Sequence, residues 1–409
     1  MKRIIAILLV IIVLIGGWLV IKTFNEGGTE PSDIPDGQET SDAVSEDETP
    51  EPEEVIPEEE VILQNMTLEQ KIGQLFIVRP ESVNGGTGIG TYMTDEMKAS
   101  LKEKMPGGVI MFSENIQDPD QITSFNENLK AASLEYFDLP MFISTDEEGG
   151  LVARIGNNQN FDVTRYNNML EIGETGDPSK AEEVGHTIGE YLSRYGFDLD
   201  FAPVSDCFTN PNNQVIGSRA FGSDPDQVSD MVGACIDGFH DEGIMTVIKH
   251  YPGHGDTDSD THTGTVMTNR SWEELKEREL IPFIGNLDKT DMIMASHIVS
   301  KGVTDDDMPA VMSEVMINEK LRDELGYDGV VITDSMEMGA ISNVYTSDEA
   351  AVRAIEAGCD IILCPMDFDT AYNGIMDAVR SGRLPEGRID ESVLRIIKLK
   401  LKYDNEEER

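Results

Sequence analysis

The stretch "GVVITDS", residues 329–335, runs from apolar residues directly into a charged one. A short apolar run of this length is typical of a buried strand, and Asp334 stands where the run stops. We therefore expect a strand that ends with its carboxylate at the edge of a sheet. Other short apolar runs divide the chain in the same way, and their number and spacing decide the fold class.

Strand-like runs alternate with longer amphipathic stretches over the folded part of the chain. The expected strands are 75–78, 107–112, 141–146, 198–206, 245–250, 292–297, 329–335 and 359–365. The expected helices include 118–136, 181–195, 226–243, 272–284, 313–325, 347–357 and 388–403. Eight alternating units predict an α/β fold, a (β/α)8 TIM barrel with a single catalytic domain. A doubly wound sheet is the alternative, but no Gly-rich dinucleotide turn follows the first strand.

Polar residues stand at the ends of five of the eight predicted strands. They are Asp146, Asp206, His250, His297 and Asp334. In a barrel the carboxyl ends of the strands converge on one face, which is where active sites of such barrels form. The sequence therefore predicts a catalytic site at this face.

The first 60 residues differ from the rest. Lys2 and Arg3 precede an apolar stretch from Ile4 to Ile21, which is close to the length of a membrane-spanning helix. We interpret residues 1–23 as a signal anchor that leaves the remainder outside the cytoplasm, with a cleaved and secreted form as the alternative. Residues 24–60 are rich in Glu, Asp, Pro, Ser and Thr, which predicts a disordered acidic linker before the domain at 61–409.

The net charge excludes one class of partner. The formal charge is −47 at pH 7, and residues 61–409 alone carry −35. Such a surface repels nucleic acid and other polyanions. Nothing in the sequence implies a protein partner or a cofactor.

The segment "KHYPGHGDTDSDTHTG", residues 249–264, holds three of the six histidines. A metal site is one interpretation, but His250 and His254 follow a strand and do not share a helix face as in an HExxH motif. A calcium loop would need Gly and Glu where Thr261 and Met267 stand. Three aspartates disfavour a phosphate, and a plain surface loop would be an unusual place for so many histidines.

Acid/base chemistry remains. Asp260 and His262 are two residues apart, so in an extended segment they face the same side and can pair. The carboxylate would hold the imidazole in one tautomer, and a Gly-rich loop could carry the pair over a bound substrate. Asp334 is the natural candidate for a nucleophile opposite this pair.

Seven further motifs share their order with one enzyme family. They are "NMTLEQKIGQLFIV" (65–78), "STDEEGGLVARI" (144–155), "GFDLDFAPVSD" (196–206), "GSRAFGSDP" (217–225), "MASHIV" (294–299), "PAVMS" (309–313) and "VVITDSMEMGAI" (330–341). Together with the histidine segment they resemble glycoside hydrolase family 3, in its single-domain NagZ-type β-N-acetylglucosaminidase (β-hexosaminidase) branch. The resemblance covers roughly residues 61–403.

The resemblance implies a retaining exo-β-N-acetylglucosaminidase acting on peptidoglycan or its muropeptide fragments. Asp334 would be the nucleophile that forms a covalent glycosyl-enzyme intermediate, and His262, oriented by Asp260, would be the acid/base. The sugar-binding residues it implies are Asp146, Arg154, Arg219, Lys249 and His250. No metal or cofactor is implied.

Several alternatives stay open at this point. Asp146 could cap a turn instead of binding sugar, and Arg219 could pair with Asp224. Leu151 stands where relatives often carry a basic residue, which leaves a contact there in doubt. A histidine acid/base also tolerates an anionic acceptor, so a phosphorylase is an alternative, as are a β-glucosidase-type enzyme and an inactive wall-binding module.

Overall fold

The computed structural model describes residues 56–86, 88–257, 264 and 266–407. By its contacts the chain divides into Met1–Val55 and Ile56–Arg409, and only the second unit contains described residues. The predicted signal anchor and most of the predicted linker therefore lie outside the described residues. Within the described part, no helix has the length and apolar character that crossing a membrane requires.

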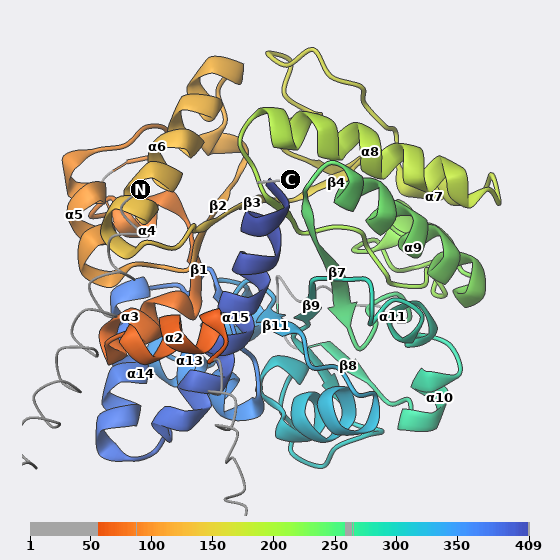
Figure 1. The fold of residues 1–409 in the computed structure, drawn as a ribbon. Coiled ribbons are helices and arrows are strands. Elements are labelled where there is room, and N and C mark those ends of the chain that lie inside the picture. Colours follow the sequence, from red (N-terminus) through yellow and green to blue (C-terminus); the bar gives the residue numbers. More distant parts are fainter. Residues whose placement is uncertain (1–55, 87, 258–263, 265, 408–409) are drawn as a thin grey trace, which may run out of the picture. The chain divides into compact units, whose positions relative to one another are not determined.

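Eight parallel strands form the centre of the unit (Figure 1). In chain order they are β1 (Phe76–Val78), β2 (Gly108–Met111), β3 (Phe142–Thr145), β6 (Leu199–Asp200), β7 (Met245–Tyr251), β9 (Met292–Ala295), β11 (Val330–Thr333) and β12 (Ile362–Leu363). From β1 to β11, each of these eight strands pairs with the next one along the chain, and β12 pairs with β1. The strand order is therefore that of a barrel, with no crossover between distant strands.

The remaining gap, between β11 and β12, is bridged by a few hydrogen bonds. Thr333 N donates to Ile361 O at 3.0 Å, and Met336 N donates to Leu363 O at 2.9 Å. A parallel bridge between Ile332 and Ile361 lies at the same seam. The sheet is thus a nearly closed parallel barrel, as expected for a (β/α)8 fold.

Helices connect the strands and cover the outside of the barrel (Figure 1). They are α2 (Glu58–Asn65), α3 (Leu68–Gln74), α4 (Pro80–Val83), α5 (Asp95–Lys104), α6 (Pro119–Phe137), α7 (Met169–Gly173), α8 (Pro178–Arg194), α9 (Pro225–Asp241), α10 (Trp272–Lys276), α11 (Ile281–Ile284), α12 (Gly339–Ser342), α13 (Ser347–Ala357), α14 (Phe368–Ser381) and α15 (Glu386–Glu407). Short 3-10 helices are η1 (Ser113–Asn115), η2 (Gly217–Arg219) and η3 (Ala310–Met312), and η4 (Val315–Glu324) is a π-helix. Two small sheets, β4 (Glu147–Gly149) with β5 (Val152–Ala153) and β8 (Val266–Thr268) with β10 (Ile298–Ser300), lie in the connections.

Local sequence explains where the three longest connecting helices of the first half begin. Helices α6, α8 and α9 each start with an Asp-Pro pair, in which Asp118, Asp177 or Asp224 is the N-cap. The aspartate side chain accepts hydrogen bonds from the first free backbone N–H groups, and proline suits the first helical position because it has no N–H to lose. The Asp224 side chain therefore bonds to the first turn of α9.

The eight predicted strands all occur, one of them only in part, and some of the helices differ from the prediction. The run 198–206 forms regular strand only at Leu199–Asp200, and it rejoins the sheet through one bridge between Val204 and Lys249. Pro203 lies between these points and has no N–H to donate to a ladder. The predicted helix 272–284 is two short helices, α10 and α11, and the helix α14 was not predicted.

Candidate active site

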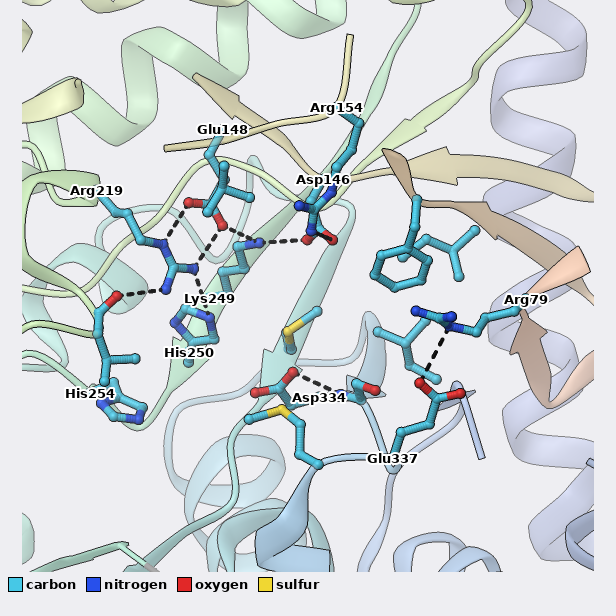
Figure 2. Close-up of a pocket in the computed structure, with 18 of the residues that line it drawn as sticks. Arg79, Asp146, Glu148, Arg154, Arg219, Lys249, His250, His254, Asp334 and Glu337 are labelled. Carbon is cyan, nitrogen blue, oxygen red and sulfur yellow. Dashed lines mark hydrogen bonds and ion pairs between the residues drawn. The ribbon is translucent and has the colours of Figure 1, made fainter. Parts of the chain in front are cut away.

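A cavity of about 420 Å³ lies at the carboxyl ends of the barrel strands. Its charged lining residues are Arg79, Asp146, Glu148, Arg154, Arg219, Lys249, His250, His254, Asp334 and Glu337 (Figure 2). Its apolar lining includes Ile110, Phe112, Met294 and Leu363. The five polar strand ends that the sequence suggested thus do gather near one face, and Asp146, His250 and Asp334 line the cavity itself.

Glu148 and Lys249 form the centre of a network of ion pairs on one side of the cavity. Glu148, from β4, accepts hydrogen bonds from Nε and Nη2 of Arg219, each at 2.7 Å. Lys249, from β7, lies 2.5 Å from Glu148 Oε1 and 2.9 Å from Asp146 Oδ1. Arg154 Nη2 reaches the other oxygen of Asp146 at 3.1 Å. Acids and bases therefore alternate from Arg219 to Arg154, and we call this row the ion-pair belt.

Glu148 and Lys249 are buried, the other three members of the belt are partly buried, and the charges hold each other in the ionised state. Burial alone would raise the pKa of the Asp146 and Glu148 carboxyls, but the adjacent Lys249, Arg154 and Arg219 cations outweigh it, and both pKa values lie below the usual range. Burial would lower the pKa of the Lys249 amine, but the two carboxylates raise it. Fixed charges of both signs suit the hydroxyl groups of a sugar, which donate and accept hydrogen bonds.

Glu147 explains how the hairpin that carries these acids keeps its shape. Its side chain points away from the cavity and is fully buried. Glu147 Oε2 accepts from the backbone N–H groups of Arg154 at 2.6 Å and Ile155 at 2.8 Å, and Oε1 accepts from Gly156 N at 2.7 Å and Tyr191 Oη at 2.8 Å. The three bonds from the backbone close the turn between β4 and the residues after β5 and so fix the position of Arg154, and the fourth ties the carboxylate to α8.

Asp334 follows β11 and lies across the cavity from the ion-pair belt (Figure 2). Its Oδ1 accepts a hydrogen bond from Ser335 N at 2.7 Å. Burial would raise the pKa of this carboxyl, but the imidazoles of His297 and His250 and the Ser335 N–H group lower it further than burial raises it. The lowered pKa favours the ionised carboxylate, which is the state that a nucleophile requires.

His250 belongs to a second buried pair. Its Nδ1 lies 2.6 Å from Asp206 Oδ2, and its Nε2 lies 3.4 Å from Arg219 Nη2. Asp206 also accepts from the backbone N–H group of His254 at 2.5 Å. His254 is buried, and its Nδ1 lies 2.7 Å from the hydroxyl oxygen of Thr257. This contact links the backbone turn that follows β7 to the His254 side chain.

Arg79 and Glu337 form the wall of the cavity on the side away from Arg219 and Glu148 (Figure 2). Arg79 Nε lies 3.3 Å from Glu337 Oε2, and Nη1 lies 3.3 Å from Glu114 Oε1. The guanidinium also stacks 4.1 Å from the centroid of the Phe112 ring. The pKa of Glu337 lies above its usual value, because burial and the nearby Glu81 and Glu114 carboxylates raise it more than Arg79 lowers it.

Six of the eight predicted site residues are described, and the structure brings all six together. Asp334, Asp146, Arg154, Arg219, Lys249 and His250 line the one cavity. Asp260 and His262 lie outside the described residues. The alternative for Arg219 is wrong, because Arg219 pairs with Glu148 instead of Asp224. Both Asp146 oxygens contact cations, and sugar binding by Asp146 stays a prediction.

Sequence reasoning missed four residues of the site. Glu148 is the last of three consecutive acids, and the sequence does not show which of the three faces the cavity. Arg79 and Glu337 belong to no recognisable motif spacing. Asp206 had a usable signal, because it was one of the polar strand ends, but its partner His250 was not evident from the sequence.

The fold and the cavity define a barrel protein of the enzyme type, with a nucleophile candidate in a cavity at the carboxyl ends of the strands. A family model, "Glycosyl hydrolase family 3 N terminal domain", matches residues 67–399. The chain belongs to this family.

Several curated and solved relatives are similar to the chain. It is 33% identical over 338 residues to Beta-hexosaminidase A of Pseudoalteromonas piscicida, covering 76% of this chain and 56% of that protein. It is 34% identical over 278 residues to a Beta-hexosaminidase of Tolumonas auensis, covering 67% of this chain and 80% of that protein. A solved glycoside hydrolase family 3 beta-N-acetylglucosaminidase from Paenibacillus sp. str. FPU-7 matches with a TM-score of 0.78 and 36% identity, over 83% of this chain and 63% of its own. The chain thus spans little more than half of the first relative.

Proposed function

We propose that the protein is a retaining exo-β-N-acetylglucosaminidase that removes terminal N-acetylglucosamine from peptidoglycan-derived glycans. The observation that carries the proposal is the position of Asp334 at the end of β11, where it lines a cavity whose other side is the ion-pair belt. The cavity volume lies within the range of about 300–1,000 Å³ typical of small-molecule sites. The names of the Beta-hexosaminidase relatives and of the beta-N-acetylglucosaminidase from Paenibacillus support the choice of sugar.

The reaction would proceed in two steps. Asp334 attacks the anomeric carbon of the bound sugar and forms an ester, while the glycosidic oxygen departs with a proton from His262. His262, oriented by Asp260, then takes a proton from water, and this water cleaves the ester with net retention of configuration. Lys249, Asp146, Arg154, Arg219 and His250 would hold the hydroxyl groups of the sugar during both steps.

Turnover of an aryl β-N-acetylglucosaminide tests the proposal. Wild-type protein should release the phenol, and Asp334→Asn should lower the rate by at least about a thousandfold, because the ester can no longer form. Asp328→Asn is the matched control, since Asp328 lies at the other end of the same strand with its side chain 91% exposed. A near-normal rate in Asp334→Asn would refute the assignment of the nucleophile.

The acceptor and the location need separate measurements. Product analysis on a disaccharide muropeptide with and without phosphate distinguishes hydrolysis from phosphorolysis, since only the second yields a sugar phosphate.

We propose that residues 1–23 anchor the domain outside the cytoplasmic membrane. Recovery of the full-length chain in the membrane fraction, with the domain cleaved by protease added to intact cells, would support this location, whereas recovery in the cytosol would refute it.

A further inference from the structure

Asp206 is a fully buried carboxylate that accepts three hydrogen bonds from the histidine segment. Its Oδ2 accepts from His250 Nδ1 at 2.6 Å and from His250 N at 3.2 Å, and its Oδ1 accepts from His254 N at 2.5 Å. Asp206 itself comes from the connection after β6, not from the segment that it holds. One side chain thus attaches two residues of β7 and its following loop to the neighbouring part of the barrel.

These contacts determine the direction of hydrogen bonding at His250. Because a carboxylate only accepts hydrogen bonds, the proton on His250 must reside on Nδ1. The other ring nitrogen, Nε2, lies 3.4 Å from Arg219 Nη2, and a guanidinium only donates. The ring is therefore placed between an acceptor and a donor, and Nε2 faces the ion-pair belt with its lone pair.

We propose that Asp206 is a positioning residue for sugar binding. It holds His250 in the Nδ1–H tautomer, so that the single lone pair of His250 Nε2 is free to leave its long 3.4 Å contact with Arg219 Nη2 and accept a hydrogen bond from a hydroxyl group of the substrate. The inference rests on the proposed function for the identity of the ligand as a sugar. It assigns a role to Asp206 that acts through His250, without contact between Asp206 and the substrate.

A second carboxylate–histidine pair in the same protein, with a buried carboxylate and a partly exposed histidine, provides a comparison. Asp291 lies 2.8 Å from His240 Nε2 and accepts a hydrogen bond from Thr246 N at 2.9 Å. Asp291 is 6% exposed and lies at the start of β9, at the opposite end of the strands from the cavity. This pair has the same chemistry as the Asp206–His250 pair but lies away from the active site. A substitution of Asp291 therefore reports the loss of stability from breaking such a pair, without an effect on the substrate.

The tautomer can be measured directly by ¹⁵N NMR of protein labelled at histidine, with His250→Gln used to assign the resonance. We expect the neutral imidazole of wild-type His250 to carry its proton on Nδ1 and to have an unprotonated Nε2. A proton on Nε2 with Nδ1 bare would overturn the proposal. This measurement does not depend on activity, so it decides the role of Asp206 even if the wild-type protein turns over no aryl N-acetylglucosaminide, in which case the proposed function fails by itself.

A double-mutant cycle then tests the coupling. Asp206→Asn should lower kcat/KM for the aryl N-acetylglucosaminide about tenfold or more in the wild-type background, mainly through KM, but less than about twofold in the His250→Gln background. An equal loss in both backgrounds would show that Asp206 only supports the fold and would overturn the proposal. Asp291→Asn is the control: it should lower the melting temperature and leave kcat/KM of the folded protein within about twofold. If Asp206→Asn does not fold, the wild-type tautomer alone decides.

Discussion

Lys400 provides the sharpest test of the electrostatics of the barrel. This α15 residue is 3% exposed, and its Nζ donates to Gln74 Oε1 at 2.8 Å and to Gly107 O at 2.9 Å. The amine also lies 4.8 Å from the centroid of the Phe142 ring. Burial lowers the pKa of Lys400 to about 7, although the Asp198 carboxylate raises it in part.

The sign and size of the effect on stability follow from this shift. Between a folded-state pKa of about 7 and the ordinary lysine value of 10.5, the unfolded chain holds a proton that the folded chain lacks. The free energy of unfolding should therefore rise with pH across this window, by up to about 1.4 kcal/mol per pH unit and by about 5 kcal/mol in all. Below pH 7 both states are protonated, and the full cost of the buried charge remains.

The perturbation is Lys400→Met, which keeps the length of the side chain and removes the charge. Urea unfolding of wild type and variant at pH 7, 8 and 9 gives the difference in the free energy of unfolding at each pH. This difference should shift in favour of the wild type by about 1 kcal/mol or more per pH unit, because only the wild type gains from the rise. Lys398→Met, at an exposed position of the same helix, should show no such trend. Parallel curves for wild type and Lys400→Met would refute the reasoning.

Three further predictions concern the site and its support. Because the pKa of Asp334 lies below its usual range, the acid limb of kcat/KM, measured from pH 3 to 7, should fall below about pH 4, and a limb near pH 6 would contradict this assignment. Glu148→Gln leaves Arg219 and Lys249 without their shared anion, so urea unfolding should show a loss of about 3–5 kcal/mol, and a loss below about 1 kcal/mol would show that the belt is not needed for stability. Gly173→Ala would place a Cβ 1.5 Å from a backbone carbonyl oxygen, so the same assay should show a loss of at least about 1–3 kcal/mol, and a neutral effect would contradict the close packing of α7.

The barrel could be predicted because its signal is local. Each strand is a short buried run, and parallel order follows from the alternation with helices. Asp334 and His250 could be predicted for the same reason, since a polar residue at the end of such a run has few structural explanations. Helix α14 was missed although Asp367 caps it, because its start lies only a few residues beyond the last strand.

The partners within the site could not be predicted because they depend on distant segments. Glu147 and Glu148 are adjacent in sequence, yet one supports a turn and the other contacts Arg219, 71 residues away. Successive side chains of a strand point to opposite faces, so Glu147 and Glu148 of β4 point apart. Arg79 meets Glu337 only because β1 and β11 flank β12 in the closed barrel. No spacing rule contains such information.

The ion-pair belt has a consequence for recognition in different surroundings. The protein as a whole carries a formal charge of −47, and its outer field changes with the ions around it. Inside the cavity each carboxylate of the belt already has a cation beside it, so an uncharged ligand meets local dipoles of fixed direction instead of a net field. Mobile ions cannot enter between partners at hydrogen-bond distance. The proposed binding of a neutral sugar by the belt should therefore depend little on ionic strength, although the outer surface of the protein is strongly acidic.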